Sequence, residues 1–277
     1  MFSLQIKGRF TNPYKSRDRF EVDEMTNQMI GYYSARKERL LKDFESTCAL
    51  MKASLIARYG KEFASTLQKE VRQEYEMLIP EIPYIKGSRA RMLNSFLLIT
   101  SQELAAYKAM NKHGKPPGEV WELCHEALRY RLAEIPHWKR WSLRCFMFSR
   151  LVRKIMARRA RQQQKTRFGD FEIEYLIGEG DEFDFGVNYL QCGNQNFVKK
   201  HGGEDFAPYV CMSDIALSEA MGWGLIRTQT LADDCPHCDF RFKQGGATQI
   251  SSKTPEVQEA IDRIGKKEAE KIVLADG

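Results

Sequence analysis

The stretch FEIEYLIGEGDEFDFGVNY, residues 171–189, decides the fold class of this chain. Its apolar side chains occupy every second position on both sides of the sequence Gly178–Asp181, whereas the residues before it follow a helical period. Two alternating segments joined by a glycine-containing turn are typical of a β-hairpin. We therefore predict that the chain changes from helices to a sheet close to residue 171.

The first 168 residues carry the apolar spacing of amphipathic helices and no catalytic signature. Prolines near residues 83 and 136 predict breaks, because proline cannot continue a helix. A long basic segment, residues 139–169, contains eleven Lys or Arg and no Asp or Glu. The predicted helices run from Met25 to about residue 55, from Gly60 to about 78, over 88–111, from Pro117 to about 135, and over 141–163.

After the hairpin, the pattern predicts two helices and two further strands. The helices cover Asn194–His201 and Pro208–Met221, and the strands cover Leu225–Leu231 and Cys238–Gln244. The order ββααββ predicts an α+β protein with a small antiparallel four-stranded sheet, on which a helical N-terminal half packs. We predict three regions, namely the helical residues 1–168, the α+β module 169–247, and a peripheral tail 248–277 with a charged helix.

Composition limits the function classes. Apolar residues make up 43% and charged residues 29% of the chain, as in globular proteins. No apolar run approaches the ~20 residues that cross a bilayer, and the first twenty residues lack the apolar core of a secretory signal. Seven cysteines, an odd number, do not fit a secreted disulfide framework. We therefore expect a cytoplasmic protein without a membrane partner.

The formal net charge of +6 is too mild to indicate nucleic acid by itself. The cations of the basic segment fall all around the predicted helix, with apolar residues between them. This pattern favours a core helix with solvated basic flanks, or a rim that attracts anionic substrates, over a phosphate-backbone binder. We expect a small-molecule substrate and no nucleic acid, and the sequence leaves a homo-oligomer open.

Asp214 is the first candidate for catalysis. It shares a helical stripe with Val210, Leu217 and Met221, where a carboxylate is costly unless it is paired or hydrogen-bonded. It acts either as a general base or cation anchor in a partly dry site, or as a structural residue that caps a loop or pairs with Arg227 or Arg241. Cys211, one turn earlier, either shares that site or is a small core residue.

The segment CPHCDFRF, residues 235–242, offers a second group of candidates. Cys235 and Cys238 have the spacing of metal and dithiol sites, but a redox pair normally opens a helix and this one leads into a strand. We expect no metal and no cofactor. The alternative is a zinc ion held by these two thiols with Cys192 or Cys211.

Within the same strand, Asp239 and Arg241 face the side opposite to Cys238. They form either a solvated surface pair or part of a covered site in which Arg241 binds a carboxylate. His201, at the end of a short helix, is either a helix C-terminal cation or an acid–base group near neutral pH. Tyr189 and Thr228 complete the substrate-binding set that we predict with Arg241 and His201.

At these residues the chain resembles a known family, the L-2-amino-thiazoline-4-carboxylic acid hydrolases. The resemblance lies in FDFGVNYLQCGNQNFVKKHG (183–202) and APYVCMSDIALSEAMGWGLIRTQTLADDCPHCDFRF (207–242), with weaker similarity in IPYIKG (82–87) and EVWELCHEALRYRLAEIP (119–136). More distantly, the C-terminal pattern is similar to small-molecule-binding domains of the 4-vinyl reductase type. That second similarity implies the same ββααββ arrangement.

The family resemblance implies a hydrolase that opens the cyclic isothiourea 2-aminothiazoline-4-carboxylate to N-carbamoyl-cysteine. Asp214 or Asp239 suits the activation of water and the binding of the amidinium group, and Arg241 suits the substrate carboxylate. Alternatively, the thiolate of Cys211 or Cys238 attacks the amidine carbon. The second similarity implies a different function, that of a sensor or carrier that binds a small molecule without turnover.

Overall fold

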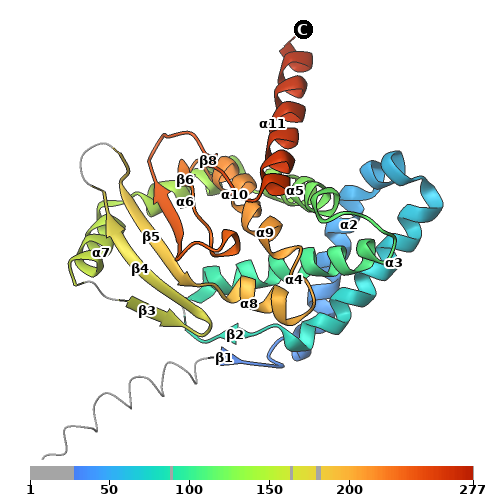
Figure 1. Cartoon of the computed structure of the whole chain (residues 1–277), viewed down its shortest axis with the longest axis horizontal. Helices are drawn as coiled ribbons and strands as arrows, with labels where there is room; N and C mark the ends of the chain where they lie inside the picture. Colours follow the sequence, from blue (N-terminus) through green and yellow to red (C-terminus); the bar gives the residue numbers. More distant parts are fainter. Residues whose placement is uncertain (1–27, 88–89, 163–164, 179–181, 277) are drawn as a thin grey trace, which may run out of the picture.

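The computed structural model of the chain describes residues 28–87, 90–162, 165–178 and 182–276, and Figure 1 shows their arrangement. Gly60 alone separates the first two long helices, and its φ of 79° is a conformation that glycine adopts without steric cost. The helices before the main sheet are α2 (Lys37–Tyr59), α3 (Lys61–Leu78), α4 (Arg91–Asn111), α5 (Pro117–Ala133), α6 (His137–Met147) and α7 (Arg150–Arg161).

The main sheet has the strand order β3-β4-β5-β7-β6-β8. Every neighbouring pair is antiparallel except β6 and β8, which are parallel. A small separate sheet pairs β1 (Gln28–Met29) with β2 (Tyr84–Ile85). The strands of the main sheet are β3 (Lys165–Phe168), β4 (Phe171–Ile177), β5 (Phe185–Gln191), β6 (Leu225–Arg227), β7 (Cys238–Phe242) and β8 (Gln249–Ile250).

The predicted α+β class and the hairpin at residue 171 are confirmed, but the four-stranded antiparallel sheet is wrong at both edges. The four predicted strands are the central β4, β5, β7 and β6, and β3 and β8 extend them to six. The edge strands escaped the pattern because β3 is a polar segment that directly follows the basic helices, and β8 has only two residues. The parallel pairing of β8 depends on the path of the chain after Phe242, which no local pattern encodes.

Three predicted helices differ from the structure. The first begins at Lys37, after the short strand β1, and Met25 lies outside the described residues. The basic helix is two helices, because the Ser149 side chain accepts a hydrogen bond from the Val152 N–H at 3.3 Å and starts α7 anew. The predicted helix 208–221 consists of α9 (Ala207–Val210), a 3₁₀ turn (Cys211–Ser213) and α10 (Asp214–Met221).

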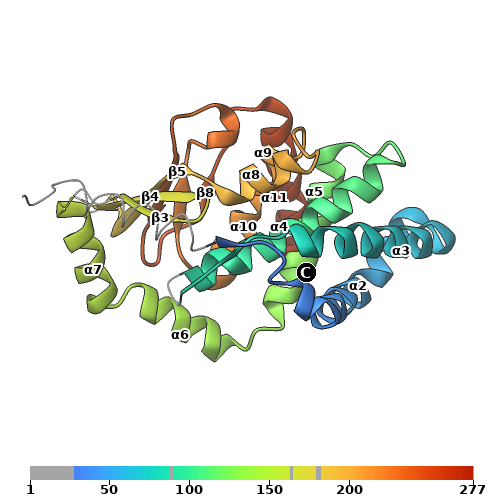
Figure 2. The same cartoon turned by 90° about the horizontal axis from the view of Figure 1, so that it is seen from below.

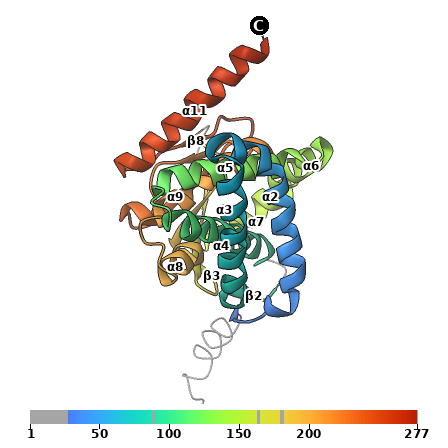
Figure 3. The same cartoon turned by 90° about the vertical axis from the view of Figure 1, so that its right-hand side faces the viewer.

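Helix α4 lies at the centre of the molecule. It contacts α3 and α5 on one side and α8 (Gly193–Lys200) on the other, and Figures 1 and 3 show it between the helical bundle and the C-terminal elements. One hydrophobic core contains Leu97 and Leu104 of α4 together with Phe171 and Phe185 of the sheet. The core therefore continues across the predicted boundary at residue 168.

The tail forms α11 (Pro255–Asp276), which begins where the sequence predicts a charged helix. Its first turns bury Val257, Ala260 and Ile264, and Arg263 Nε lies 2.8 Å from Glu122 Oε1 on α5. Its far end extends away from the rest of the chain (Figures 1 and 3). Across the described residues, no helix combines the length and the apolar character that a membrane span requires.

Candidate active site

A cavity of about 110 Å³ lies between one face of the main sheet and the helices α4 and α10. Tyr189 of β5 and Cys238 of β7 are cross-strand partners, so both side chains project from the same face. Arg227 ends β6 and Asp214 begins α10, and both line this cavity together with Glu103 of α4. Elements more than a hundred residues apart in the sequence therefore contribute to one small site.

The centre of the site is an ion pair between Asp214 and Arg227. Arg227 is 1% exposed, and its Nη1 lies 2.5 Å from Asp214 Oδ2 and 2.8 Å from the carbonyl oxygen of Cys211. Burial raises the pKa of Asp214, and the guanidinium of Arg227 opposes that rise. Because a guanidinium stays protonated in proteins, Asp214 is ionised as its counter-ion. Of the two structural partners that the sequence left open for Asp214, the structure selects Arg227.

Glu103 is a second carboxyl group in the site, and the sequence analysis missed it. Its side chain is buried, and Ser213 Oγ donates a hydrogen bond of 2.6 Å to Oε1, while Oε2 has no hydrogen-bond partner. Its pKa is raised to about 8, mainly by burial and in part by the charge of Asp214, against the hydrogen bond from Ser213. Glu103 is therefore mostly protonated at neutral pH.

The signal that reveals Glu103 is the stripe argument that singled out Asp214. Glu103 lies on the same side of α4 as three other side chains. Phe96 is seven residues before it, Thr100 is three residues before it, and Tyr107 is four residues after it. A carboxyl group on such a stripe requires a partner or a proton. Applied to α4, the same argument would have placed Glu103 among the candidates.

Further polar atoms in the site lack a protein partner. Asn194 Oδ1, Gln195 Oε1 and Arg227 Nε are buried without a hydrogen bond, and all three residues line the cavity. Gln195 is held in place by its Nε2, which donates to the carbonyl oxygen of Ala207 at 2.6 Å. Buried polar atoms normally find partners, so a cluster of such atoms around one cavity indicates a ligand that supplies them.

The thiols of the site are protonated. Cys192, Cys211 and Cys238 all line the cavity, and burial raises the pKa of each to about 12. A thiol becomes an effective nucleophile or metal ligand as its thiolate. The environment of these cysteines therefore favours carboxylate chemistry over covalent attack by sulfur.

Asp239, Arg241 and Thr228 lie outside this cavity. The Asp239 carboxylate accepts hydrogen bonds from Thr228 Oγ1 at 2.8 Å and from the Thr228 and Gln229 backbone N–H groups. Arg241 donates to the carbonyl oxygen of Phe240, and its guanidinium lies 5.4 Å from the centre of the Phe183 ring. Strand alternation separates Asp239 and Arg241 from Cys238, as the sequence predicted. Of the predicted site residues, the cavity therefore brings together Tyr189, Cys211, Asp214 and Cys238, whereas Asp239, Arg241 and Thr228 lie outside it.

His201 is also outside the cavity. It stands at the C-terminal cap of α8, with its ring centre 4.6 Å from that of Phe197. Burial lowers the pKa of His201, and the charge of Lys200 lowers it further. This side chain therefore carries less charge near neutral pH than an exposed histidine.

The four C-terminal cysteines do not form the cluster that the zinc alternative requires. Cys235 Sγ lies 3.6 Å from the carbonyl oxygen of Asp233, and Cys238 Sγ accepts a hydrogen bond from the Leu231 N–H at 3.2 Å. Throughout the part of the chain that the structure describes, no group of three or more His, Cys, Asp or Glu is placed to hold a metal ion.

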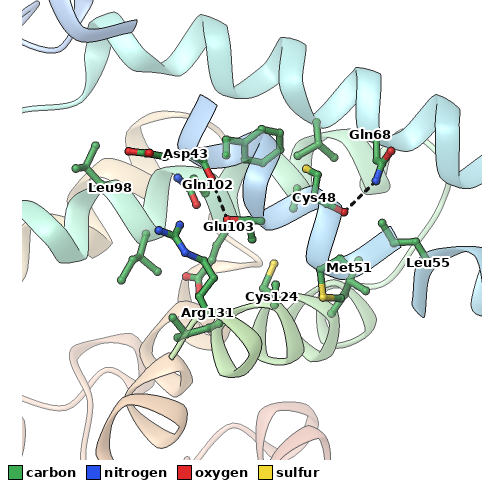
Figure 4. Close-up of a pocket in the computed structure, with 18 of the residues that line it drawn as sticks. Asp43, Cys48, Met51, Leu55, Gln68, Leu98, Gln102, Glu103, Cys124 and Arg131 are labelled. Atoms are coloured by element: carbon green, nitrogen blue, oxygen red, sulfur yellow. Dashed lines mark hydrogen bonds between the residues drawn. The ribbon is translucent and has the colours of Figure 1, made fainter. Parts of the chain in front are cut away.

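A larger cavity of about 430 Å³ lies on the other side of α4, among α2, α3, α4 and α5. Its wall is mostly apolar, and Glu103 lines both cavities. Figure 4 shows Asp43, Gln102, Glu103 and Arg131 toward one end, and Met51 and Leu55 toward the other. Burial raises the pKa of Cys48 in this wall to about 12.

Comparison with known proteins relates the site to a family. The family model described as L-2-amino-thiazoline-4-carboxylic acid hydrolase matches residues 95–242, which include every residue of the small cavity named above. No curated protein and no solved structure matches the chain.

Proposed function

Since this chain belongs to the L-2-amino-thiazoline-4-carboxylic acid hydrolase family, we propose that it opens a small cyclic amidine that carries a carboxylate, such as 2-aminothiazoline-4-carboxylate, to the N-carbamoyl amino acid. The reaction takes place in the 110 Å³ cavity. That volume is below the range of roughly 300–1,000 Å³ that is usual for drug-sized ligands, which favours a substrate of few atoms.

The polar atoms of the cavity suit the two ends of such a substrate. Arg227 uses Nη1 for Asp214 and Nη2 for Met212 Sδ at 3.4 Å, while its Nε has no partner, so Nε–H is the donor that remains for the substrate carboxylate. This assignment replaces Arg241, which lies outside the cavity. Asn194 Oδ1 and Gln195 Oε1 are acceptors, and they suit the N–H donors of the amidine.

The two carboxyl groups divide the acid–base work. The Asp214 carboxylate takes a proton from water as the water oxygen bonds to the carbon of the protonated amidine. The carbon–sulfur bond of the resulting tetrahedral intermediate then breaks, and the neutral Glu103 gives its proton to the departing sulfur. As the carbonyl forms, the hydroxyl proton of the intermediate passes to the Glu103 carboxylate, and the proton on Asp214 leaves to solvent. The products are a urea-type carbonyl and a free thiol. Carboxyl groups whose environments separate their pKa values are the usual means of this division.

One observation carries this proposal, namely that Asp214, Arg227 and Glu103 share a small cavity with unpartnered amide oxygens. A pair with only a structural role would not require the surrounding acceptors to lack partners. Asp214, Arg227, Glu103 and the unpartnered amides all lie within the residues that match the hydrolase family.

The direct test incubates the purified chain with 2-aminothiazoline-4-carboxylate and measures the thiol released. We expect turnover that Asp214→Asn lowers by about two orders of magnitude or more and that Asp239→Asn retains, because the second carboxylate lies outside the cavity. A panel of cyclic amidine carboxylates with other ring atoms tests the substrate class. Absence of turnover across the panel, or equal loss in the two variants, would contradict the proposed site.

A second candidate function is the binding of an apolar small molecule without turnover. The 430 Å³ cavity supports it, because such a volume with apolar walls is of the size that ligand sites have. Titration with the fluorescent probe anilinonaphthalene sulfonate measures it, and Ala127→Phe, which fills that cavity, should remove the binding. Tight probe binding with no turnover on any amidine would favour this candidate over the hydrolase.

A further inference from the structure

Helices α6 and α7 expose large apolar side chains. Trp138 and Phe146 are each 64% exposed, Leu151 is 62% exposed and Trp141 is 53% exposed. Figure 2 shows the two helices along one outer side of the molecule. We call the exposed side chains of residues 138–161 the α6–α7 surface. A soluble protein rarely exposes so many large apolar groups on two consecutive helices unless the surface has a partner.

The orientation of α6 makes this exposure informative. Arg140, Arg144 and Met147 of α6 are partly buried, whereas its two tryptophans are exposed. Helix α6 packs on α10 through this more polar side. Large apolar side chains such as these tryptophans are normally buried against the body of the protein. Because they face solvent here, we infer that a partner outside this chain covers the apolar face of α6.

The α6–α7 surface is also basic. The segment 139–169 has eleven cations and no acidic residue. Within residues 138–161, Arg153 lies 3.5 Å from Asp184 and Arg159 donates a hydrogen bond of 2.5 Å to the Tyr175 hydroxyl, so these two cations are tied to the body. Other cations have no ion pair with any described residue, namely Lys139, Arg150, Lys154, Arg158 and Arg161.

Charge and apolar exposure together identify the occupant. A second copy would bring the same cations face to face, and like charges repel. A nucleic acid would neutralise the cations, but its polar surface offers nothing to Leu151 or Ile155. An anionic lipid surface satisfies both features, because headgroups bind Lys and Arg while Trp, Phe and Leu enter the boundary of the acyl chains.

We propose that α6 and α7 dock the protein on the surface of an anionic lipid bilayer, with both helices in the plane of the interface. The expectation that the protein has no membrane partner rested on the absence of a spanning segment, and a surface-bound helix needs none. Met147, at the end of α6, also lines the small cavity, so the docked surface lies beside the candidate active site.

The test is sedimentation of the full chain with vesicles of phosphatidylcholine alone and with vesicles of phosphatidylcholine and phosphatidylserine in equal amounts. We expect binding to the mixed vesicles only, and weaker binding as salt increases. Replacing both tryptophans (Trp138→Ser with Trp141→Ser) should weaken binding by about tenfold or more. Replacing Lys154, Arg158 and Arg161 by Gln should weaken it by roughly fivefold for each cation removed.

Two matched controls make the outcome decisive. Met77→Ser removes a methionine that is 61% exposed on α3, and Lys42→Gln with Lys52→Gln removes cations from α2; both should leave vesicle binding unchanged. Melting curves check that every variant is folded. No binding to anionic vesicles, equal binding to both vesicle types, or equal loss in the controls would overturn the proposal. Duplex DNA that binds the chain while the vesicles do not would assign the surface to nucleic acid instead.

Discussion

The two cavities that flank α4 differ in how they treat polar groups. The cavity of about 430 Å³ has a mostly apolar wall, and its charged residues Asp43 and Arg131 are exposed to solvent. The cavity of about 110 Å³ holds an ion pair whose arginine is buried, and a neutral carboxyl group. Size therefore does not identify the reactive site. Buried charge does, because desolvating a charge costs several kcal/mol and the fold gains little stability in return.

Breaking the ion pair of the small cavity should have the largest effect, which is a loss of stability. Arg227→Met leaves the Asp214 carboxylate, whose side chain is 25% exposed, without its partner, and we expect unfolding free energy to fall by roughly 3–5 kcal/mol in urea denaturation. Replacing both residues (Asp214→Leu with Arg227→Met) should recover most of that loss and abolish turnover. Arg131→Met in the large cavity should change stability little, because that side chain is exposed. Equal destabilisation by Arg227→Met and Arg131→Met would remove the contrast between the cavities.

The second largest effect should be on turnover, which a variant in the small cavity should lower and a variant in the large cavity should not. We expect Asp214→Asn to lower turnover by about two orders of magnitude or more, the usual effect of losing a general base. The assay is run well below the melting temperature of the variant, since the change also leaves Arg227 without its counter-ion. Asp43→Asn, at the large cavity, is the matched control and should retain turnover. If folded Asp214→Asn keeps its activity per molecule, Asp214 is structural only.

Glu103, which lines both cavities, should make the stability of the protein depend on pH. Its pKa rises from 4.5 to about 8 on folding, so the folded state binds the proton more tightly than the unfolded state. The stability due to this proton is fully present below about pH 4.5 and is lost as pH rises through about 8. When denaturation is measured from pH 5 to 9, the free energy of unfolding of Glu103→Gln should fall less with rising pH than that of the unmodified chain.

The same variant should reduce turnover by about a hundredfold, at the lower end of the range for acid–base groups. Turnover of the unmodified chain should fall above about pH 8, as the acid is lost. Glu45→Gln, exposed on α2, serves as the control for both measurements. A pH profile that stays flat through this range would remove Glu103 from the mechanism.

The cysteines should matter less. Because the pKa values of the Cys211 and Cys238 thiols are raised to about 12, we expect Cys211→Ala and Cys238→Ala to reduce turnover by less than about tenfold. Alkylation with iodoacetamide at neutral pH should likewise be slow. Loss of all turnover in one of these variants, with a trapped covalent adduct, would establish sulfur as the nucleophile.

Metal removal should have the smallest effect. We propose that the reaction needs no resident metal, so dialysis against a strong chelator should leave turnover unchanged. Elemental analysis of the purified chain measures the content directly. Near-stoichiometric zinc that disappears in Cys235→Ser would restore the metal alternative and shift the mechanism to metal-activated water.

How well each feature of the site could be predicted depended on the range of the interaction. Asp214 could be identified from its helix alone, because an acid on an apolar stripe is anomalous wherever the helix packs. Strand alternation alone also placed Cys238 and Arg241 on opposite faces. The choice of Arg227 over Arg241 as the partner of Asp214 required the positions of β6 and β7 in the sheet. Glu103 was missed because the N-terminal half was interpreted as scaffold.

The sequence by itself determined the α+β class, the hairpin at residue 171 and the helices of the bundle, because hydrophobic period and proline positions act within a few residues. Its resemblance in residues 183–202 and 207–242 also indicated the family. Only the tertiary structure decided the edge strands, the two cavities and the meeting of Glu103 with Asp214, 111 positions later in the numbering. Those features depend on how α4 packs between the bundle and the sheet, and no local pattern specifies which distant side chains a helix brings together.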